Sequence, residues 1–356
     1  MKTPLTNHSG TQHPYSPLRI LCLVDWQLSP GYRWLWDFLP DFNDQVEFVS
    51  ISPPTDRFPG LGKFLGYYQK YFLLALKAFP KMNHCDIVLA WEAKNGLPLA
   101  FLRKLTSDVQ TPLVILNFVL KGNFAQNFLG LIRYALRSVD KIICVSKKEV
   151  DIYPKVLKLP KNKFVQIPTV RPDYFADQPL RYSDYIFAAG RSHRDYATLL
   201  SAFQDLPSRL VINARPFNLR GLKPPDNVTI NKFQPFMDYI TYIRNAKFII
   251  LPLYEAKHAS GETFILDSMA ASKAVIATRT FSTEEFIKPG VNGYLVEPGD
   301  ITGLKKKILK LLNNPGEAVR MGINARQMYE SNWSFPVIAP RIRHLLHQVV
   351  MEKTHP

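Results

Sequence analysis

The sequence predicts an α/β protein with two domains, each built around a parallel sheet. Its 356 residues exceed the usual size of one domain and suit two domains of about 150 residues each. Short apolar runs alternate with helical patterns along the chain, as in a parallel sheet with crossover helices. A proline-containing stretch without periodicity, residues 168–183, divides this series. We therefore expect a disordered arm over 1–17, a first domain over 18–170, a linker over 171–183, a second domain over 184–335 and a final helix over 336–356.

The first half begins with a predicted buried strand, Arg19–Val24, which is followed by an aromatic helix, Tyr32–Phe38. This order is that of a Rossmann-like unit. The glycine fingerprint of dinucleotide sites, Gly-x-Gly-x-x-Gly, does not occur here, so we expect no dinucleotide in this half. The remaining strands predicted for this half are Val46–Ile51, Ile87–Ala90, Leu113–Leu116 and Lys141–Val145.

The second half is organised around one strand, loop, helix and strand. Phe248–Leu251 predicts a central parallel strand, and Ser260 is a good N-cap for a helix that starts near Gly261. Apolar residues at helical spacing follow, and Ala274–Ala277 predicts the next buried strand. The other elements predicted for this half are strands at Tyr185–Ala189, Arg209–Asn213 and Val228–Asn231, and helices at Asp195–Phe203, Phe236–Arg244 and Pro336–Val350.

The corner at Ser260 and Gly261 has the features of an anion site. A helix N-terminus offers free N–H groups and the positive end of the helix dipole, and glycine has no side chain to obstruct a phosphate. Glu262 and Asp267 lie where they can reach polar groups beside such an anion. The pattern predicts a phosphate flanked by hydroxyl-bearing sugars. The alternative is a simple cap with an acidic first turn, with Asp267 facing solvent.

Two longer segments resemble the donor-binding half of glycosyltransferase family 4, which has the GT-B fold. They are Leu266–Thr278 and Gly290–Asp300. Ala189-Gly190-Arg191 with Arg194 resembles the phosphate-gripping segment of that family. Four positions depart from its pattern: the first of its two glutamates falls on Ala259 and the second on Asp267, and Arg194-Asp195 replaces a lysine and glycine. Arginine keeps the positive charge and favours bidentate phosphate binding.

The resemblance implies two Rossmann-like parallel-sheet domains facing a cleft, with the C-terminal helix crossing back to the first domain. It implies nucleotide-sugar binding in the second domain, where Asp267 would contact the ribose diol. The catalytic residues that it implies are Arg191, Arg194 and Glu262, and the donor-binding residues are Gly190, Phe233, Ser260, Gly261, Thr263 and Asp267.

The implied reaction is a retaining, metal-independent transfer of a sugar to a glycan or lipid-linked acceptor, in cell-envelope polysaccharide or glycolipid synthesis. The nucleotide-sugar is a co-substrate and no cofactor is expected. Asp-x-Asp does not occur in the sequence, in line with arginines and a helix N-terminus in place of a divalent cation. The alternatives are an inverting transferase or nucleotide-sugar epimerase of the same fold, with Asp25 or Glu92 as base, and a non-catalytic membrane adaptor.

Loops that follow the first-half strands carry the candidates for acceptor contacts, since ligands bind beyond the carboxyl ends of parallel strands. For each candidate, an ordinary surface-loop residue is an equally open interpretation. The candidates are Asp25, Trp26, Gly31, Glu92 and Lys121.

A basic, aromatic helix is predicted over residues 62–80. Lys63, Lys70 and Lys77 recur every seven residues on one stripe, Tyr71 and other apolar residues cover the rest, and no acidic residue occurs between Arg57 and Lys81. Such a helix is typical of contact with an anionic membrane surface. A core helix with a solvated lysine stripe is an equally open interpretation.

The net charge of +16 indicates an anionic partner. No nucleic-acid-binding module is recognisable, so we expect no nucleic acid. Cys22, Cys85 and Cys144 stand singly without metal-ligand spacing, which predicts reduced thiols and no metal site. With neither a signal peptide nor a transmembrane run in the sequence, we expect a cytoplasmic protein that is peripheral on the cytoplasmic face of a membrane.

Overall fold

The computed structural model describes residues 16–26, 33–39, 42–51, 61–106, 109–120, 127–169, 171–176, 179–232, 236–255 and 259–354. Of residues 61–68 and 232 only the backbone is described. The predicted arm up to residue 15 and the candidates Gly31, Lys121 and Phe233 lie outside these ranges, as does the side chain of Lys63.

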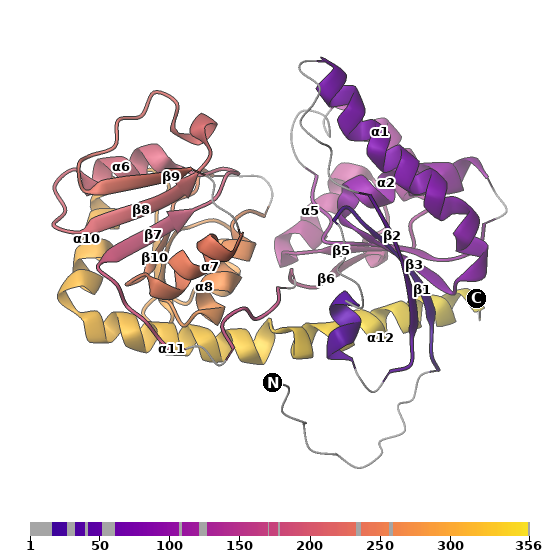
Figure 1. Ribbon diagram of the computed structural model, residues 1–356. Coiled ribbons are helices and arrows are strands. Elements are labelled where there is room, and N and C mark those ends of the chain that lie inside the picture. Colours follow the sequence, from indigo (N-terminus) through magenta and orange to yellow (C-terminus); the bar gives the residue numbers. More distant parts are fainter. Residues whose placement is uncertain are drawn as a thin grey trace, which may run out of the picture. The chain divides into compact units, whose positions relative to one another are not determined.

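The first sheet has six strands in the order β2-β1-β3-β4-β5-β6 (Figure 1). β1 lies between β2 and β3 and is parallel to both. Its residues are buried from the second position onward because the run Ile20–Val24 is wholly apolar. The strands are β1 (Arg19–Val24), β2 (Gln45–Ser50), β3 (Ile87–Trp91), β4 (Leu113–Leu116), β5 (Lys141–Cys144) and β6 (Phe164–Gln166).

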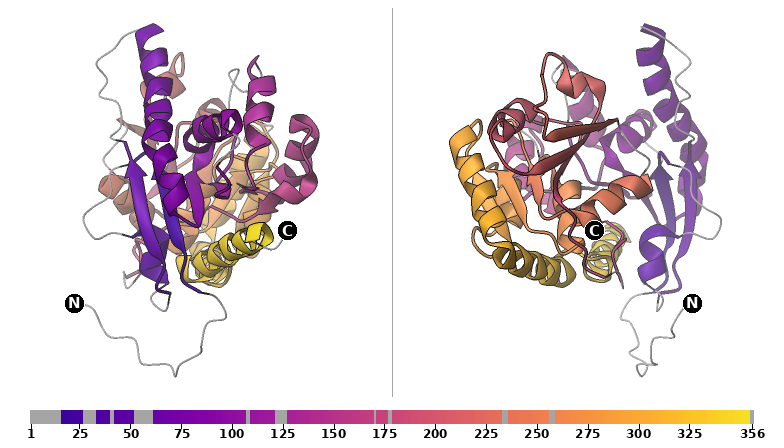
Figure 2. Two further views of the ribbon diagram at one scale, coloured as in Figure 1. Left: turned by 90° about the vertical axis from the view of Figure 1, so that its right-hand side faces the viewer. Right: turned by 60° about the vertical axis from the view of Figure 1, so that its left-hand side comes forward.

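Helices follow the strands of this sheet, as expected for parallel connections. They are α1 (Leu61–Ala78), α2 (Glu92–Leu105), α4 (Leu129–Leu136) and α5 (Lys147–Leu157). α1 lies against α2 and the β1–β2 edge of the sheet, which both views of Figure 2 show. The aromatic helix predicted over Tyr32–Phe38 is a short 3-10 helix, Trp34–Phe38.

The second sheet also has six strands, in the order β12-β11-β10-β7-β8-β9. Neighbouring strands in this sheet pair in parallel, and β10 lies between β11 and β7, as the central position predicted for this strand requires. The strands are β7 (Tyr185–Ala189), β8 (Arg209–Ala214), β9 (Val228–Lys232), β10 (Ile249–Leu251), β11 (Val275–Thr278) and β12 (Gly293–Val296).

Helices cover both faces of the second sheet (Figure 1). α6 and α10 pack on one face, and α7, α8 and the end of α11 pack on the other. The helices are α6 (Tyr196–Phe203), α7 (Phe236–Asn245), α8 (Glu262–Ala270), α9 (Thr283–Phe286), α10 (Ile301–Asn313), α11 (Pro315–Asn332) and α12 (Phe335–Thr354).

The chain forms two compact units. One comprises residues up to Ile115, Tyr134–Asp140 and the residues from Ile342 onward, and the other comprises Leu116–Arg133 and Lys141–Arg341. Within the first unit, Arg343 of the last helix makes a buried ion pair with Asp44 at 2.8 Å, which anchors that helix beside the first sheet. The α/β class and the two parallel sheets predicted from sequence are confirmed. The residue boundaries of the domains stay a prediction.

Candidate active site

Two loops that were predicted to bind phosphate meet at the carboxyl ends of the inner strands of the second sheet. The loop after β7 carries Gly190–Arg194, and the loop after β10 leads to Gly261 at the start of α8. β7 and β10 are parallel neighbours, so their carboxyl ends lie side by side. Hydrogen bonds join the loops: Asp195 N donates to Pro252 O at 3.2 Å, Tyr254 N to His193 O at 3.0 Å, and Ser260 Oγ to Ser192 O at 3.4 Å.

Gly190 and Arg194 fit each other closely. Gly190 has φ +123°, and a Cβ there would collide with the guanidinium of Arg194. Arg194 is buried, and its Nε and Nη1 donate to the carbonyls of Ala189 at 2.8 Å and Ser192 at 2.7 Å. Burial lowers the pKa of Arg194, and the negative charge of Glu262 acts in the opposite direction. Arg194 therefore shapes the loop itself.

The other predicted phosphate ligand, Arg191, has a different environment. Its side chain is exposed, while its carbonyl accepts a hydrogen bond from Asn218 Nδ2 at 2.8 Å. Asp195 caps α6 by accepting from Thr198 N at 3.0 Å, so the residue that replaces the family's glycine has a helix-capping role. Of the two arginines, Arg191 is the one with an exposed side chain, and its role as a phosphate ligand stays a prediction.

The predicted N-cap at Ser260 is wrong. The N-cap of α8 is Gly261, with φ +95°, and a Cβ at that position would collide with the side chain of Leu251. Ser260 instead exchanges hydrogen bonds with Ser282 and contacts Ser192. The left-handed turn requires glycine, which leaves the first N–H groups of α8 next to a position without a side chain.

Glu262 and Thr263 form the first turn of α8. Glu262 is half-buried and its charge acts on Arg194, whereas Thr263 is exposed. Arg194 and Glu262, which were both predicted from sequence to belong to this site, thus interact electrostatically. The catalytic and donor-binding roles of these residues stay predictions.

Asp267 is not a solvent-facing residue. It is 1% exposed, and its two oxygens accept from Arg171 Nε at 3.1 Å, Arg171 Nη2 at 3.2 Å and Tyr239 Oη at 2.9 Å. Burial raises the pKa of Asp267, and the charge and hydrogen bonds of Arg171 work against this rise. A ribose contact by Asp267 stays a prediction.

Sequence reasoning missed Arg171 and Tyr239. Arg171 lies 96 residues before Asp267 in the stretch assigned to a linker, and Tyr239 lies in α7. The only hint of these partners in the sequence was Asp267 itself, which lies among the apolar positions of α8. A buried carboxylate needs a partner that compensates its charge. Glu149 of α5 was also missed, although the capping-box spacing from Ser146 could have drawn attention to it.

In the first unit, two acceptor candidates lie together. Asp25 and Glu92 both pair with Lys94, at 2.7 Å and 2.8 Å, and Trp26 packs edge-to-face on Trp91. The structure therefore brings together three of the five predicted acceptor-side residues, and it adds Lys94 and Trp91.

One membrane candidate is corrected. Tyr71 is 2% exposed and its hydroxyl lies 3.3 Å from Asp25 Oδ2, so it faces the sheet. Lys70 is half-buried over the Tyr71 ring, and Lys77 is exposed. The described part of α1 also exposes three of the apolar side chains that the sequence places on this helix: Phe72, Leu73 and Leu76.

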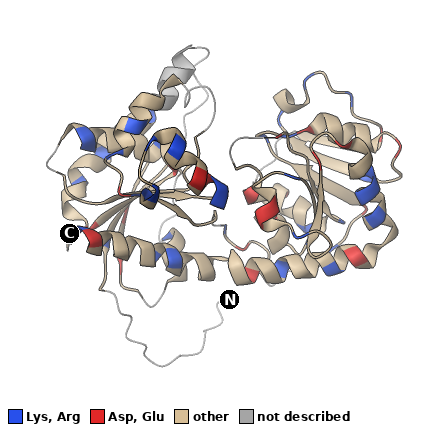
Figure 3. Cartoon of the chain, turned by 180° about the vertical axis from the view of Figure 1, so that it is seen from behind, with Lys and Arg blue, Asp and Glu red and all other residues tan. Residues whose placement is uncertain are grey.

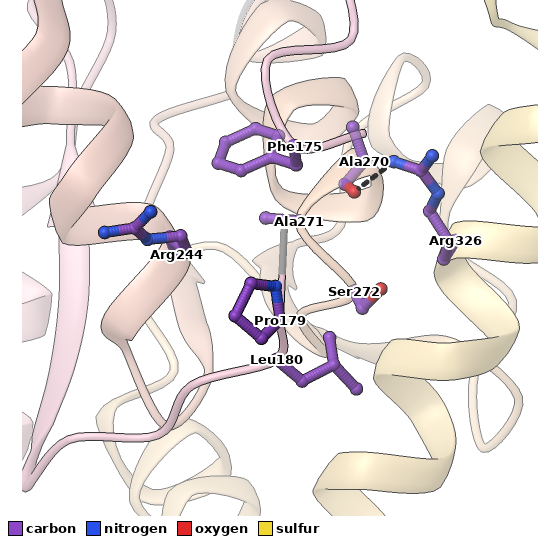
Figure 4. A pocket seen from close by; sticks show the side chains of 8 residues that line it. All are labelled: Phe175, Pro179, Leu180, Arg244, Ala270, Ala271, Ser272 and Arg326. Atoms are coloured by element: carbon purple, nitrogen blue, oxygen red, sulfur yellow. Dashed lines mark hydrogen bonds between the residues drawn. The ribbon is translucent and has the colours of Figure 1, made fainter. Parts of the chain in front are cut away.

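A separate pocket of about 260 Å³ lies at the other end of α8 (Figure 4). Arg244 and Arg326 are among its lining residues. Arg326 is engaged there, since it pairs with Asp173 and Glu330 at 2.6 Å and donates to Ala270 O at 2.6 Å. α8 is roughly 13 Å long, so this pocket is remote from Gly261.

The three cysteines are free thiols. In the described ranges, no group of three or more His, Cys, Asp and Glu side chains is arranged to hold a metal ion. Nor does any helix in those ranges combine the length and apolar character needed to cross a membrane.

Comparison with known proteins supplies independent information. Residues 218–328 match the model of the family Glycosyl transferases group 1. An uncharacterised glycosyltransferase of Methanocaldococcus jannaschii is 25% identical over 260 residues, which cover 70% of this chain and 69% of that protein.

Two solved structures are similar over nearly the whole chain. Anabaena HepE in complex with UDP and glucose has a TM-score of 0.66 at 15% identity, and the match covers 93% of this chain and 100% of that one. Sucrose-phosphate synthase from Thermosynechococcus elongatus has a TM-score of 0.71 at 17% identity, with coverage of 94% and 100%.

Proposed function

Because the chain is a glycosyltransferase with the GT-B fold, we propose that it transfers a sugar from a nucleotide-sugar donor to a glycan or lipid-linked acceptor. One observation carries the proposal: the Gly190–Arg194 loop and the N-terminus of α8 meet at the carboxyl ends of β7 and β10. The complex of the Anabaena protein with UDP and glucose supports a donor of this class.

The donor diphosphate would lie between Arg191 and the first N–H groups of α8. Negative charge grows on this diphosphate as the glycosyl bond breaks, and arginine with a helix N-terminus stabilises such charge. The buried Arg194 holds the loop that presents Arg191, and Glu262 is coupled to it. The proposed transfer needs no cofactor and no metal, and it retains the anomeric configuration because the departing diphosphate accepts the acceptor proton on the same face.

The acceptor would be carried by a membrane. Three apolar side chains of α1 are exposed by 43%, 54% and 46%, namely Phe72, Leu73 and Leu76, and Lys77 is exposed beside them. Apolar groups next to lysine on one helix suit an anionic lipid surface. Lys and Arg also lie on helices elsewhere in the chain (Figure 3). We place the protein at the cytoplasmic face of a membrane, in cell-envelope polysaccharide or glycolipid synthesis.

A panel of UDP-, GDP- and ADP-sugars, incubated with the protein in EDTA, tests this function. The expected result is turnover of one donor without added metal and a product whose anomeric configuration, measured by NMR, equals that of the donor. A product with the opposite anomeric configuration would identify an inverting transferase, and an epimerised donor would identify an epimerase. Binding of a nucleotide-sugar without turnover would favour the adaptor.

A further inference from the structure

A charged network lies at the carboxyl ends of β1 and β3 in the first unit. The ammonium of Lys94 is 2.7 Å from Asp25 and 2.8 Å from Glu92, and Tyr71 Oη lies 3.3 Å from Asp25. Lys70 adds a second positive charge above the Tyr71 ring, at 4.6 Å. The charges of two carboxylates and two ammonium groups thus balance. Burial lowers the pKa of Lys94, whereas the negative charges of Glu92 and Asp25 raise it.

The carboxylates differ in access. The Glu92 side chain is 36% exposed and that of Asp25 is 16% exposed. Glu92 also has φ +64°, a left-handed conformation that is unfavourable for a residue with a Cβ. Such strained residues cluster at functional sites, and Glu92 lies at the turn from β3 into α2.

Aromatic rings lie next to this network. Trp26, Trp34 and Trp91 pack edge-to-face on one another, with ring centroids 5.1–5.8 Å apart. Trp34 is buried, whereas Trp26 and Trp91 are half-buried. Trp26 follows Asp25 and Trp91 precedes Glu92 in the chain, so each half-buried ring is adjacent to one carboxylate.

We propose that Asp25, Glu92, Lys94 and the two half-buried tryptophans form the binding site for an uncharged acceptor sugar with neighbouring hydroxyl groups. The C–H face of a sugar ring is apolar and packs on an indole ring, and a fixed carboxylate accepts hydrogen bonds from neighbouring hydroxyls. Because the network is already balanced in charge, it has no net charge with which to favour an anionic sugar. Lys94 is a positioning residue that orients both carboxylates. This inference rests on the proposed function.

Acceptor kinetics test the proposal with the full chain and the donor that it turns over. The probes are the methyl glycosides of glucose, galactose, mannose and N-acetylglucosamine, together with glucuronic acid as the anionic comparison. Glu92→Gln is expected to raise the acceptor KM about tenfold, the equivalent of one charge-assisted hydrogen bond, with a smaller change in kcat. Trp26→Ala is expected to raise the acceptor KM as well. Lys81→Met removes an exposed lysine paired with Glu47 and serves as the matched control with unchanged KM.

Binding is measured in parallel by the change in tryptophan emission on addition of each glycoside, which needs no donor. Saturable binding of a neutral glycoside that is weakened by Glu92→Gln but not by Lys81→Met supports the site. Tighter binding of glucuronic acid, or equal KM values in Glu92→Gln, Trp26→Ala and the native chain, would overturn it. A native chain that binds a glycoside but turns over no donor would contradict the proposed function and leave this site standing.

Discussion

Glu149 Oε1 accepts a hydrogen bond from the backbone nitrogen of Ala259 at a distance of 3.1 Å. The same carboxylate accepts from Ser146 N and Tyr153 Oη, both at 3.2 Å, and Glu149 is buried. A second carboxylate, that of Glu285, contacts the start of α5: its Oε1 accepts hydrogen bonds from Ser146 Oγ at 2.7 Å and from Lys147 N at 2.9 Å. Ala259 is the position at which the resemblance to glycosyltransferase family 4 implies the first of two glutamates. Here a carboxylate from α5 holds the loop before α8.

Removing this carboxylate is expected to loosen the donor loop. Glu149→Ala leaves the Ala259 N–H without its acceptor, and a buried donor without a partner costs about 1–3 kcal/mol. We expect a lower melting temperature and a raised donor KM, measured by calorimetry and initial rates. Glu330→Ala, an exposed glutamate of α11 paired with Arg326, is the control. A donor KM that rises equally in both variants would argue against a role for Glu149 in the loop.

Much of the fold could be predicted from sequence because apolar runs mark buried parallel strands. Arg19–Val24, Leu113–Leu116 and Tyr185–Ala189 have the predicted bounds. β6 and β12 were not predicted, because Phe164–Gln166 includes a glutamine and Gly293–Val296 begins with a glycine, so neither is a continuous apolar run. The first part of α1 lies where expected, but which of its faces is buried depends on contacts with α2 and the sheet.

The site was predictable in outline and not in its contacts. Gly190 and Gly261 follow strand ends, which sequence periodicity locates. Arg171, which pairs with Asp267, and Glu149, which accepts from Ala259, lie 96 and 110 residues from these partners, a distance at which one sequence holds no pairing information. For the same reason, burial of Arg194 and Asp267 could not be foreseen.

The Arg171–Asp267 pair provides a stability prediction. Arg171→Met leaves Asp267 buried without its counter-ion, and breaking a buried pair from one side costs about 3 kcal/mol or more. The loss, measured by urea unfolding, is expected to be smaller at pH 5 than at pH 8, because burial raises the pKa of Asp267 and the unpaired acid becomes neutral more readily.

Two further variants distinguish the effect of a buried unpaired charge from an unspecific loss of stability. Arg171→Met combined with Asp267→Leu is expected to recover most of the stability, since no buried charge remains. Arg279→Met breaks an exposed pair with Glu284 and Glu297 and is expected to cost less than about 1 kcal/mol. If the double variant were no more stable than Arg171→Met alone, the charge would not be the cause.

Lys273 makes the stability of the second unit depend on pH. It is fully buried, its Nζ donates to the carbonyl of Arg181, and it lies 3.8 Å from the centre of the Tyr182 ring. Burial lowers its pKa from 10.5 to about 7. Below pH 7 both folded and unfolded chains hold the proton, and the cost of the buried charge is fully present. Between pH 7 and about 10.5 only the unfolded chain binds it, so this residue makes stability rise with pH.

Lys273→Met removes this dependence. The difference in unfolding free energy between Lys273→Met and the native chain should favour the variant at pH 6.5–7 and shrink by about 4 kcal/mol towards pH 10, measured by urea titration at each pH. Lys288→Met, at an exposed position, is expected to leave the difference constant. A difference that does not change with pH in Lys273→Met would place the Lys273 pKa at its ordinary value.

If α1 attaches the protein to a membrane, substitution of its exposed leucines should abolish binding to lipid vesicles. Leu73→Glu with Leu76→Glu adds two negative charges to the apolar face and should abolish sedimentation with vesicles of phosphatidylglycerol. Leu131→Glu changes a leucine of α4 that is 50% exposed and should have little effect. Equal binding of all three proteins would remove α1 from the membrane contact.

The most direct test of the donor site is calorimetric titration in EDTA of the native chain, Arg191→Ala and Arg209→Ala with the nucleoside diphosphate of the donor that the panel identifies, which is UDP for a UDP-sugar. Arg209 begins β8 and is also exposed, so it serves as the matched control. The expected result is binding to the native chain and Arg209→Ala, and at least about tenfold weaker binding to Arg191→Ala, the loss of one charge-assisted contact. Equal affinity for this nucleoside diphosphate in all three proteins would contradict the placement of the diphosphate between Arg191 and the N-terminus of α8.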